Sequence, residues 1–213
     1  MSSSDFLHGL YFMSVSLASG FALYTVQSLI STGAEKPLRH RINTRFKSIA
    51  GCTEAKIALH EVIDYFKDPE RYTAFGARLP RGVLLYGPPG SGKTLLAKAT
   101  AGESNVNFIS CSGSEFIEVY IGVGPKRVRD IFNQARENSP CILFIDEIES
   151  LATKRTLFEG SATNFESQST INQLLTEMDG FSPTENIVVI GATNRPDLID
   201  EAILRPGRFD RKI

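Results

Sequence analysis

The segment Gly87–Thr94, with the sequence Gly-Pro-Pro-Gly-Ser-Gly-Lys-Thr, constrains the fold more than any other part of this 213-residue chain. It fits the pattern GxxxxGK[ST], and it stands between an apolar run predicted as a strand, Gly82–Tyr86, and a predicted helix through Ala101. In this context the pattern is typical of a loop whose backbone N–H groups surround phosphate oxygens, because glycines remove the Cβ atoms that would block their approach. The alternative is a glycine-rich turn without a ligand.

Apolar runs alternate with amphipathic segments along the rest of the chain. The further predicted strands are Val106–Ser110, Cys141–Ile145 and Ile187–Gly191, and the further predicted helices are Glu54–Phe66, Lys126–Glu137 and Ser167–Met178. Strands that alternate with helices predict a parallel sheet covered on both faces. The predicted fold class is therefore α/β, with three α-β-α layers.

Composition excludes several kinds of site. The formal net charge of −1 predicts no non-specific nucleic-acid binding. Cys52, Cys111 and Cys141 are far apart and form no CxxC pair, so they are interpreted as small buried apolar residues and no zinc site is predicted. His60-Glu61 begins a pattern like HExxH, but Asp64 stands where the second histidine would be needed, so both are interpreted as surface residues of a helix.

Two carboxylates follow the predicted strand Cys141–Ile145, at the end where ligands bind in open α/β sheets. Asp146 is suited to hold Mg²⁺ through water, and Glu147 is suited to orient and deprotonate an attacking water. In the glycine-rich segment, Lys93 is expected to reach the β- and γ-phosphates and the Thr94 hydroxyl to bind Mg²⁺. The predicted ligands are ATP and Mg²⁺.

These motifs resemble those of the AAA ATPases, most closely the FtsH-type membrane proteases, over residues 46–213. Besides Gly87–Thr94 and Asp146-Glu147, the resemblance rests on Gly191–Asn194 and Arg205–Asp210. Within the group, Glu118–Gly124 and Lys154-Arg155 are most similar to the mitochondrial i-AAA proteases, with bacterial FtsH and the m-AAA proteases close to them.

The resemblance implies roles for further residues. Asn194 matches a sensor of the γ-phosphate or attacking water, and Arg205 and Arg208 match arginine fingers that act on a neighbouring subunit's nucleotide. Ordinary surface arginines are the alternative. Ile49–Gly51 matches the segment that lines the adenine. The implied nucleotide-binding residues are Ile49, Ala50, Gly51, Gly87, Pro88, Pro89, Gly90, Ser91, Gly92, Lys93, Thr94, Leu95 and Asp146.

Tyr120, Ile121 and Gly122 match the aromatic–hydrophobic–glycine loop that lines the pore of such enzymes. An aromatic side chain there can grip an unfolded polypeptide by non-specific apolar contact. The alternative is that Tyr120 is a packed core residue.

The family's sheet has the strand order 5-1-4-3-2. Because the sequence stops at Ile213, the fifth strand is expected to be missing or truncated, which would leave the outer edge of Gly82–Tyr86 unpaired. The family's helical lid and HExxH peptidase domain are expected to be absent too, so the chain is interpreted as truncated before them.

Residues 1–35 form a predicted N-terminal segment with a hydrophobic helix at about 7–30, which is long enough to span a bilayer. A disordered or buried segment is the alternative. A basic linker, 36–45, follows, and then the ATPase core, 46–213. The positive charges of the linker indicate that it stays on the non-translocated side of the membrane, which would be the matrix side. The catalytic domains of i-AAA proteases face the intermembrane space instead, so the side of the membrane is left open.

The sequence therefore predicts an ATP-binding and ATP-hydrolysing module of a membrane-anchored, hexameric unfoldase or protease of membrane protein quality control. The expected location is the mitochondrial inner membrane, with a bacterial inner membrane or a chloroplast membrane as alternatives. Expected partners are FtsH-type subunits and unfolded polypeptides. The rival hypothesis is a nucleotide-binding fragment that does not turn over ATP and modulates the assembly of a full-length relative.

Overall fold

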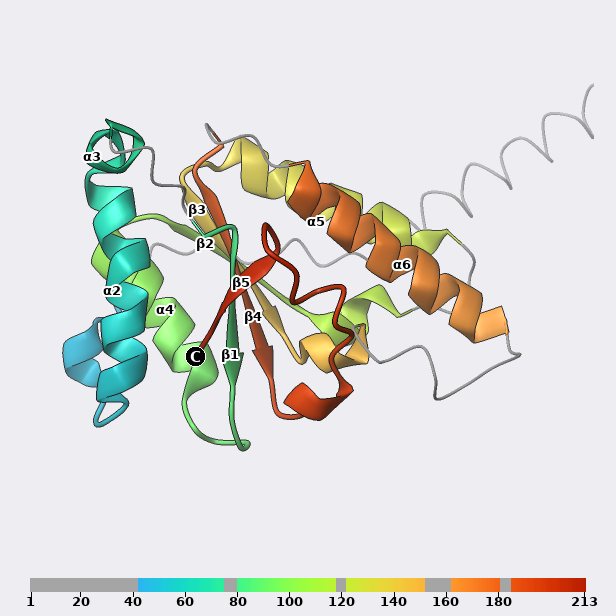
Figure 1. The fold of residues 1–213 in the computed structure, drawn as a ribbon, viewed down its shortest axis with the longest axis horizontal. Coiled ribbons are helices and arrows are strands. Elements are labelled where there is room, and N and C mark those ends of the chain that lie inside the picture. Colours follow the sequence, from blue (N-terminus) through green and yellow to red (C-terminus); the bar gives the residue numbers. More distant parts are fainter. Residues whose placement is uncertain (1–41, 75–79, 118–121, 152–161, 181–184) are drawn as a thin grey trace, which may run out of the picture. The chain divides into compact units, whose positions relative to one another are not determined.

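Among the residues that the computed structural model describes, namely 42–74, 80–117, 122–151, 162–180 and 185–213, five parallel strands form one sheet (Figure 1). Its order is β2-β3-β4-β1-β5. The strands are β1 (Gly82–Tyr86), β2 (Asn107–Ser112), β3 (Cys141–Asp146), β4 (Ile187–Thr193) and β5 (Phe209–Lys212). The predicted order is confirmed. All of these residues belong to the unit Leu38–Ile213, and the other unit, Met1–Pro37, lies outside them.

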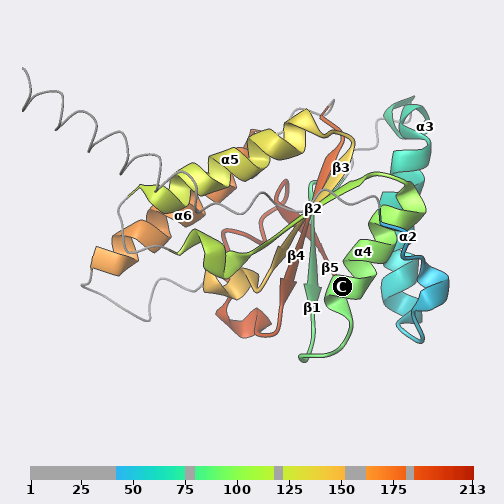
Figure 2. The same cartoon turned by 180° about the vertical axis from the view of Figure 1, so that it is seen from behind.

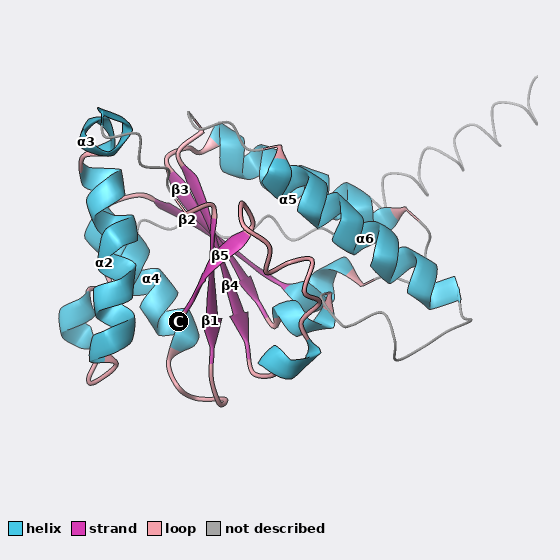
Figure 3. Cartoon of the chain, viewed as in Figure 1, coloured by secondary structure: helices cyan, strands magenta, loops and turns pink. Residues whose placement is uncertain are grey.

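Helices cover both faces of the sheet, as the three-layer prediction requires (Figure 3). The α-helices are α2 (Thr53–Lys67), α3 (Pro69–Ala74), α4 (Lys93–Ser104), α5 (Val123–Glu137) and α6 (Ala162–Asp179), and the short 3₁₀ helices are η1 (Phe46–Ser48), η2 (Gly113–Phe116), η3 (Ile148–Ser150) and η4 (Pro196–Leu198). Figures 1 and 2 show α2 and α4 on one face, and α5 and α6 on the other.

The strands are apolar on both faces because each face packs against helices. In β3, Ile142 and Phe144 join the buried cluster on the α2 and α4 side, whereas Leu143 and Ile145 join the cluster on the α5 and α6 side. This alternation is the period-two geometry of a strand. It explains why β3 reads as a continuous apolar run in the sequence.

The expectation that the fifth strand is missing is wrong. Ile213 N donates a hydrogen bond to Leu84 O at 2.9 Å, and Ile213 O accepts one from Tyr86 N at 2.9 Å. The outer edge of β1 is therefore paired with β5. Only Phe209 is buried in β5, and the Asp-Arg-Lys that follows is exposed. An edge strand with charged side chains gives no apolar run to detect, and those charges disfavour pairing with other chains.

Several predicted boundaries shift. β4 continues through Gly191 to Thr193 instead of ending at the glycine. A Cβ atom at Gly191 would lie 2.9 Å from the Phe209 ring and 3.1 Å from Ile148 Cδ1, so the glycine makes room for β5's buried side chain. α5 begins at Val123, after Gly122 in the left-handed conformation (φ 87°), and α6 begins at Ala162.

Candidate functional site

The glycine-rich segment is the loop that joins β1 to α4, at one end of the sheet (Figures 1 and 2). Gly90 and Gly92 have φ angles of 77° and 90°, a left-handed conformation that side chains with a Cβ rarely adopt. Gly92 immediately precedes α4, so the turn brings the first N–H groups of that helix to the loop. The remaining loop residues and the first turn of α4 are mostly exposed: Pro88, Pro89, Gly90, Ser91 and Leu95.

Lys93 lies over this loop and reaches across to β4. Its Nζ donates to Gly87 O at 2.9 Å and to Pro88 O at 3.0 Å. The same Nζ donates to Asn194 Oδ1 at 2.8 Å. The structure thus brings the predicted phosphate-binding lysine into contact with the predicted sensor residue, although they are far apart in the sequence.

Thr94, in the first turn of α4, contacts Asp146 at the end of β3. Thr94 Oγ1 donates to Asp146 Oδ2 at 2.9 Å. The other carboxylate oxygen, Oδ1, accepts from the Glu147 backbone N at 3.0 Å. A hydroxyl and a carboxylate side by side offer the hard oxygen atoms that Mg²⁺ prefers.

Glu147 is exposed and has a left-handed backbone with φ 51°. Non-glycine residues held in this conformation are strained and gather at functional sites. Its carbonyl accepts from Ser150 N at 3.0 Å and from Ser150 Oγ at 2.8 Å. A Cβ atom at Gly113 would lie 2.6 Å from that carbonyl, so Gly113 and Ser150 together fix the backbone of Glu147.

Lys93, Thr94, Asp146 and Asn194 come together because β1, β4 and β3 are adjacent and parallel. The carboxyl ends of these strands therefore lie at the same end of the sheet. β1 leads into the loop with Lys93 and Thr94, β3 ends at Asp146, and Asn194 follows β4. The Asn194 backbone N also donates to Glu149 Oε1 at 3.3 Å. The arrangement places a cation, a hydroxyl, a carboxylate pair and an amide around one loop.

The two arginines predicted as fingers differ in their surroundings. Arg205 is exposed, and no hydrogen bond of its side chain to another described residue is found. Arg208 forms a bidentate pair with Asp179, at the end of α6, with Nε–Oδ1 3.0 Å and Nη2–Oδ2 2.8 Å. Its Nη1 also donates to Ala202 O. These hydrogen bonds hold the pKa of Asp179 below its ordinary value of 3.8 and raise that of Arg208.

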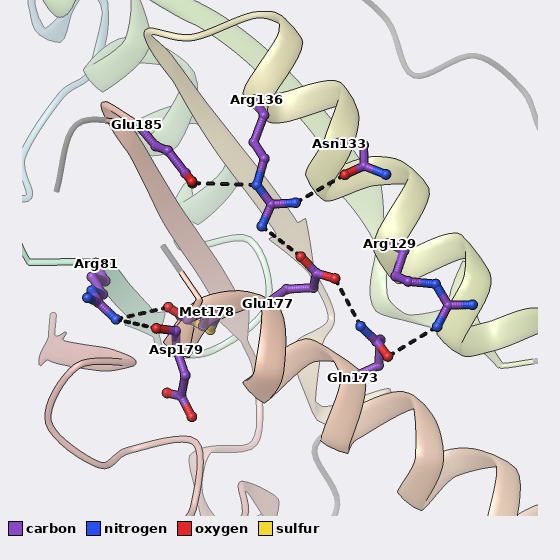
Figure 4. Close-up of polar contacts among 9 residues, drawn as sticks. All are labelled: Arg81, Arg129, Asn133, Arg136, Gln173, Glu177, Met178, Asp179 and Glu185. Carbon is purple, nitrogen blue, oxygen red and sulfur yellow. Dashed lines mark hydrogen bonds and ion pairs between the residues drawn. The ribbon is translucent and has the colours of Figure 1, made fainter. Parts of the chain in front are cut away.

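The end of α6 is held in place by neighbouring elements (Figure 4). Arg81 Nη1 donates to the carbonyls of Met178 and Asp179 at 3.2 and 3.0 Å, a favourable place for a cation because the last carbonyls of a helix lack partners within it. Along α6, Glu177 accepts from Arg136 of α5 at 2.7 Å. These contacts give Asp179 a fixed position from which to hold Arg208.

The predicted adenine segment, Ile49–Gly51, lies between η1 and α2. Ile49 is buried, whereas Ala50 and Gly51 are exposed. In Figures 1 and 2 this turn lies at the same end of the molecule as the loop before α4. In the predicted pore loop, Tyr120 and Ile121 lie outside the described residues, and Gly122 is the residue immediately before α5.

Sequence reasoning missed several residues that position the site. Asp179 and Glu149 act through partners distant in the sequence, which no local pattern indicates, whereas Ser150 contacts Glu147, three residues before it. Gly102 gave a usable signal, because a glycine inside a helix is unfavourable relative to alanine. Of the cysteines, Cys111 and Cys141 are buried as predicted, but the interpretation is wrong for Cys52, which is exposed before α2.

The described residues contain neither a metal-binding cluster of side chains nor a membrane-spanning helix. No three His, Cys, Asp or Glu side chains come together there as a metal-holding group. None of the helices in this part of the chain combines the length and the hydropathy needed to cross a bilayer. The predicted hydrophobic helix at about 7–30 falls outside the described part.

The sequence pattern of the ATPase family associated with various cellular activities (AAA) matches residues 83–213, which include the loop before α4, Asp146, Glu147 and Asn194 but not Ile49–Gly51. The chain belongs to this family. It is 51% identical to the mitochondrial inner membrane m-AAA protease component AFG3L2 of Mus musculus, over 92% of this chain and 26% of that protein. Membership of this family implies that the fold is that of an ATPase and that the site binds a nucleotide.

Similar proteins also come from bacteria and chloroplasts. The chain is 50% identical to the ATP-dependent zinc metalloprotease FtsH 1 of Methylacidiphilum infernorum, over 92% of this chain and 31% of that protein. It is 55% identical to the chloroplastic ATP-dependent zinc metalloprotease FTSH of Nicotiana tabacum, over 79% of this chain and 23% of that protein. The chain thus spans between about a quarter and a third of these relatives, and this AAA ATPase module is homologous to part of FtsH and m-AAA proteases. The expected nearness to i-AAA proteases stays a prediction.

Proposed function

We propose that this chain binds ATP with Mg²⁺ and hydrolyses it at the carboxyl ends of β1, β3 and β4. One observation carries the proposal: Lys93 contacts Asn194 at 2.8 Å while the neighbouring Thr94 contacts Asp146 at 2.9 Å, so the start of α4, the end of β3 and the residue after β4 meet at one phosphate-type loop. A glycine-rich turn with a purely structural role would not need an ammonium, a hydroxyl, a carboxylate and an amide side by side. Membership of the AAA family supports the same reading.

The residues present fit ATP and Mg²⁺. Lys93 would face the β- and γ-phosphates, where it exchanges its bonds to the carbonyls of Gly87 and Pro88 for phosphate oxygens. Thr94 would bind the metal directly and Asp146 through water, since both offer hard oxygen atoms. Mg²⁺, when bound, neutralises charge that develops on the phosphate oxygens.

Glu147 is the proposed general base. The carboxylate is exposed, and its backbone is fixed by Ser150 and by the close approach of Gly113. Glu147 would orient the attacking water and accept its proton. Asn194 Oδ1 accepts a hydrogen bond from Lys93 Nζ. From this position after β4, the Asn194 side chain would hydrogen-bond the attacking water or the γ-phosphate.

A second proposal concerns the whole protein and is based on the names of the relatives. We propose that the chain is the ATPase module of a membrane-anchored, hexameric unfoldase or protease, with residues 1–35 as anchor, 36–45 as linker and 46–213 as ATPase core, and that it carries no peptidase activity itself. Tyr120, Ile121 and Gly122 would contact unfolded polypeptides, and Arg205 and Arg208 would reach a neighbouring subunit's nucleotide. The proposed location is the mitochondrial inner membrane, where one relative is named, with a bacterial inner membrane or a chloroplast membrane as alternatives, since bacterial and chloroplastic relatives match the chain as well.

Substitutions in the site test the proposal and separate it from its rival. Lys93→Ala should abolish ATP binding, whereas Glu147→Gln should leave binding intact and stop hydrolysis. Lys98→Ala, on the same helix, is the matched control and should change neither. Binding is measured by calorimetry and hydrolysis by steady-state phosphate release, with and without a full-length relative. Hydrolysis by Glu147→Gln at the wild-type rate would show that another group activates the water, and binding without any turnover would favour the assembly modulator.

A further inference from the structure

The segment 42–48, here termed the strap, runs across the second half of α4 at very close range. An ideal Cβ atom at Gly102 would lie 2.0 Å from Thr44 O and 3.0 Å from Ile42 O. No side chain fits there, because both obstacles are backbone atoms. A glycine inside a helix is unfavourable compared with alanine, and the passage of the strap gives the physical reason for it at this position.

Glu103, the next residue of α4, holds the strap with both carboxylate oxygens. Oε1 accepts from the Phe46 backbone N at 3.1 Å, and Oε2 accepts from Arg45 Nη1 at 3.3 Å. The Phe46 ring is buried and meets His60 of α2 edge to face, with the ring centroids 5.6 Å apart. The strap is therefore fixed to α4 through its backbone and to α2 through its aromatic side chain.

The strap leads directly into Ile49–Gly51, the predicted adenine segment. Ile49 N donates to Phe46 O at 3.1 Å, so the strap's last turn fixes where this segment begins. Ile49 O accepts from Lys56 Nζ at 2.6 Å, which ties it to α2 as well. The Ile49 side chain belongs to the same buried cluster as Leu96, in the first turns of α4. Helix α4 therefore carries the phosphate loop at one end and the support of Ile49–Gly51 at the other.

We propose that Gly102 and Glu103 are positioning residues for recognition of the purine base. They would contact no part of the nucleotide. They would set the distance between the adenine segment and the phosphate loop, since both are built on the same rigid helix. The inference rests on the proposed function, because it takes Ile49–Gly51 as the segment that lines adenine. It predicts that changes on the far half of α4 affect the base and spare the phosphates.

The test compares two ligands that differ only in the nucleoside: Mg·ATP, and inorganic tripolyphosphate with Mg²⁺. Glu103→Ala should weaken ATP binding by on the order of tenfold, the effect of losing about one hydrogen bond to a charged group. Gly102→Ala should weaken it by at least as much, because its methyl group has no room beside Thr44 O. Tripolyphosphate binding should stay within about twofold. Glu103→Gln keeps an oxygen acceptor for Phe46 N and should bind ATP nearly as the wild type does. Glu137→Ala, a glutamate at the end of α5, is the matched control.

The ratio of the two affinities decides the outcome. Equal weakening of both ligands would overturn the inference, because it is the result of a purely structural defect that also loosens the phosphate loop. Unchanged ATP binding in both alanine variants would overturn it as well. If Gly102→Ala does not fold, Glu103→Ala decides alone, with its melting curve recorded beside its affinities. Failure of the wild-type protein to bind either ligand would instead refute the proposed function, and with it this inference.

Discussion

Replacement of Arg208 by alanine should destabilise the fold, whereas replacement of Arg205 should not. The Arg208 side chain is 17% exposed and its partner Asp179 is 51% exposed. Such a half-exposed ion pair contributes no more than about 1 kcal/mol. The hydrogen bond from Nη1 to the Ala202 carbonyl adds about 1 kcal/mol or somewhat more. We therefore expect Arg208→Ala to lower the free energy of unfolding by about 2 kcal/mol, and Arg205→Ala to change it by less than about 0.5 kcal/mol.

Urea unfolding of the full chain, followed by far-ultraviolet circular dichroism, measures both changes, and Asp179→Asn is the partner control. The pH dependence gives a second check. The pKa of Asp179 is lowered in the folded state, so its contribution is complete above the ordinary value of 3.8 and is lost as pH falls through the folded-state pKa. The difference between wild type and Arg208→Ala should therefore narrow below about pH 4. Equal destabilisation by the two arginine substitutions would refute the claim that the contacts of Arg208 with Asp179 and Ala202 stabilise the fold.

Three further predictions concern other parts of the chain. Phe209→Ala should cost about 3–5 kcal/mol of unfolding free energy, because it empties the space that Gly191 leaves for β5, and a loss below about 1 kcal/mol in chemical denaturation would argue against the importance of β5. A thiol reagent should modify exposed Cys52 first, since burial raises the pKa of Cys141 to about 12 and also raises that of Cys111. ATP should slow the reaction at Cys52, which follows the predicted adenine segment, and an unchanged rate with ATP would show that adenine binds elsewhere. Residues 1–35 fused to a soluble reporter should direct it to the membrane fraction and resist carbonate extraction, and a soluble fusion would contradict the predicted anchor.

Local sequence patterns predicted those parts of the site whose residues are neighbours along the chain. The phosphate loop follows from Gly87–Thr94 and the carboxylate pair from Asp146-Glu147, because strand, turn and helix signals adjoin each motif. The Asp179–Arg208 pair and the contact of Gly102 with Thr44 could not be predicted in this way. Each joins residues far apart in sequence, and only the packing of whole elements brings them together.

The fifth strand shows a different limit of sequence reasoning. Its Phe-Asp-Arg-Lys sequence has one buried side chain and three exposed charged ones, so no hydrophobic period marks it as a strand. Pairing with β1 and the space at Gly191 specify it instead. An edge strand gains its stability from backbone bonds and one anchor residue, and neither feature is visible in composition.

The position of β4 bears on the order in which the molecule is made. β4 lies between β1 and β3 in the sheet, yet the ribosome synthesises it after both. A nascent chain that has emerged only through β3 has the phosphate loop and Asp146, but it lacks the strand that joins their two halves of the sheet. Pairing across such long sequence separations is slow, and unpaired strand edges are prone to association. Nucleotide capture should therefore begin only once Asn194 has left the exit tunnel, and until then the facing edges of β1 and β3 stay unpaired and open to association.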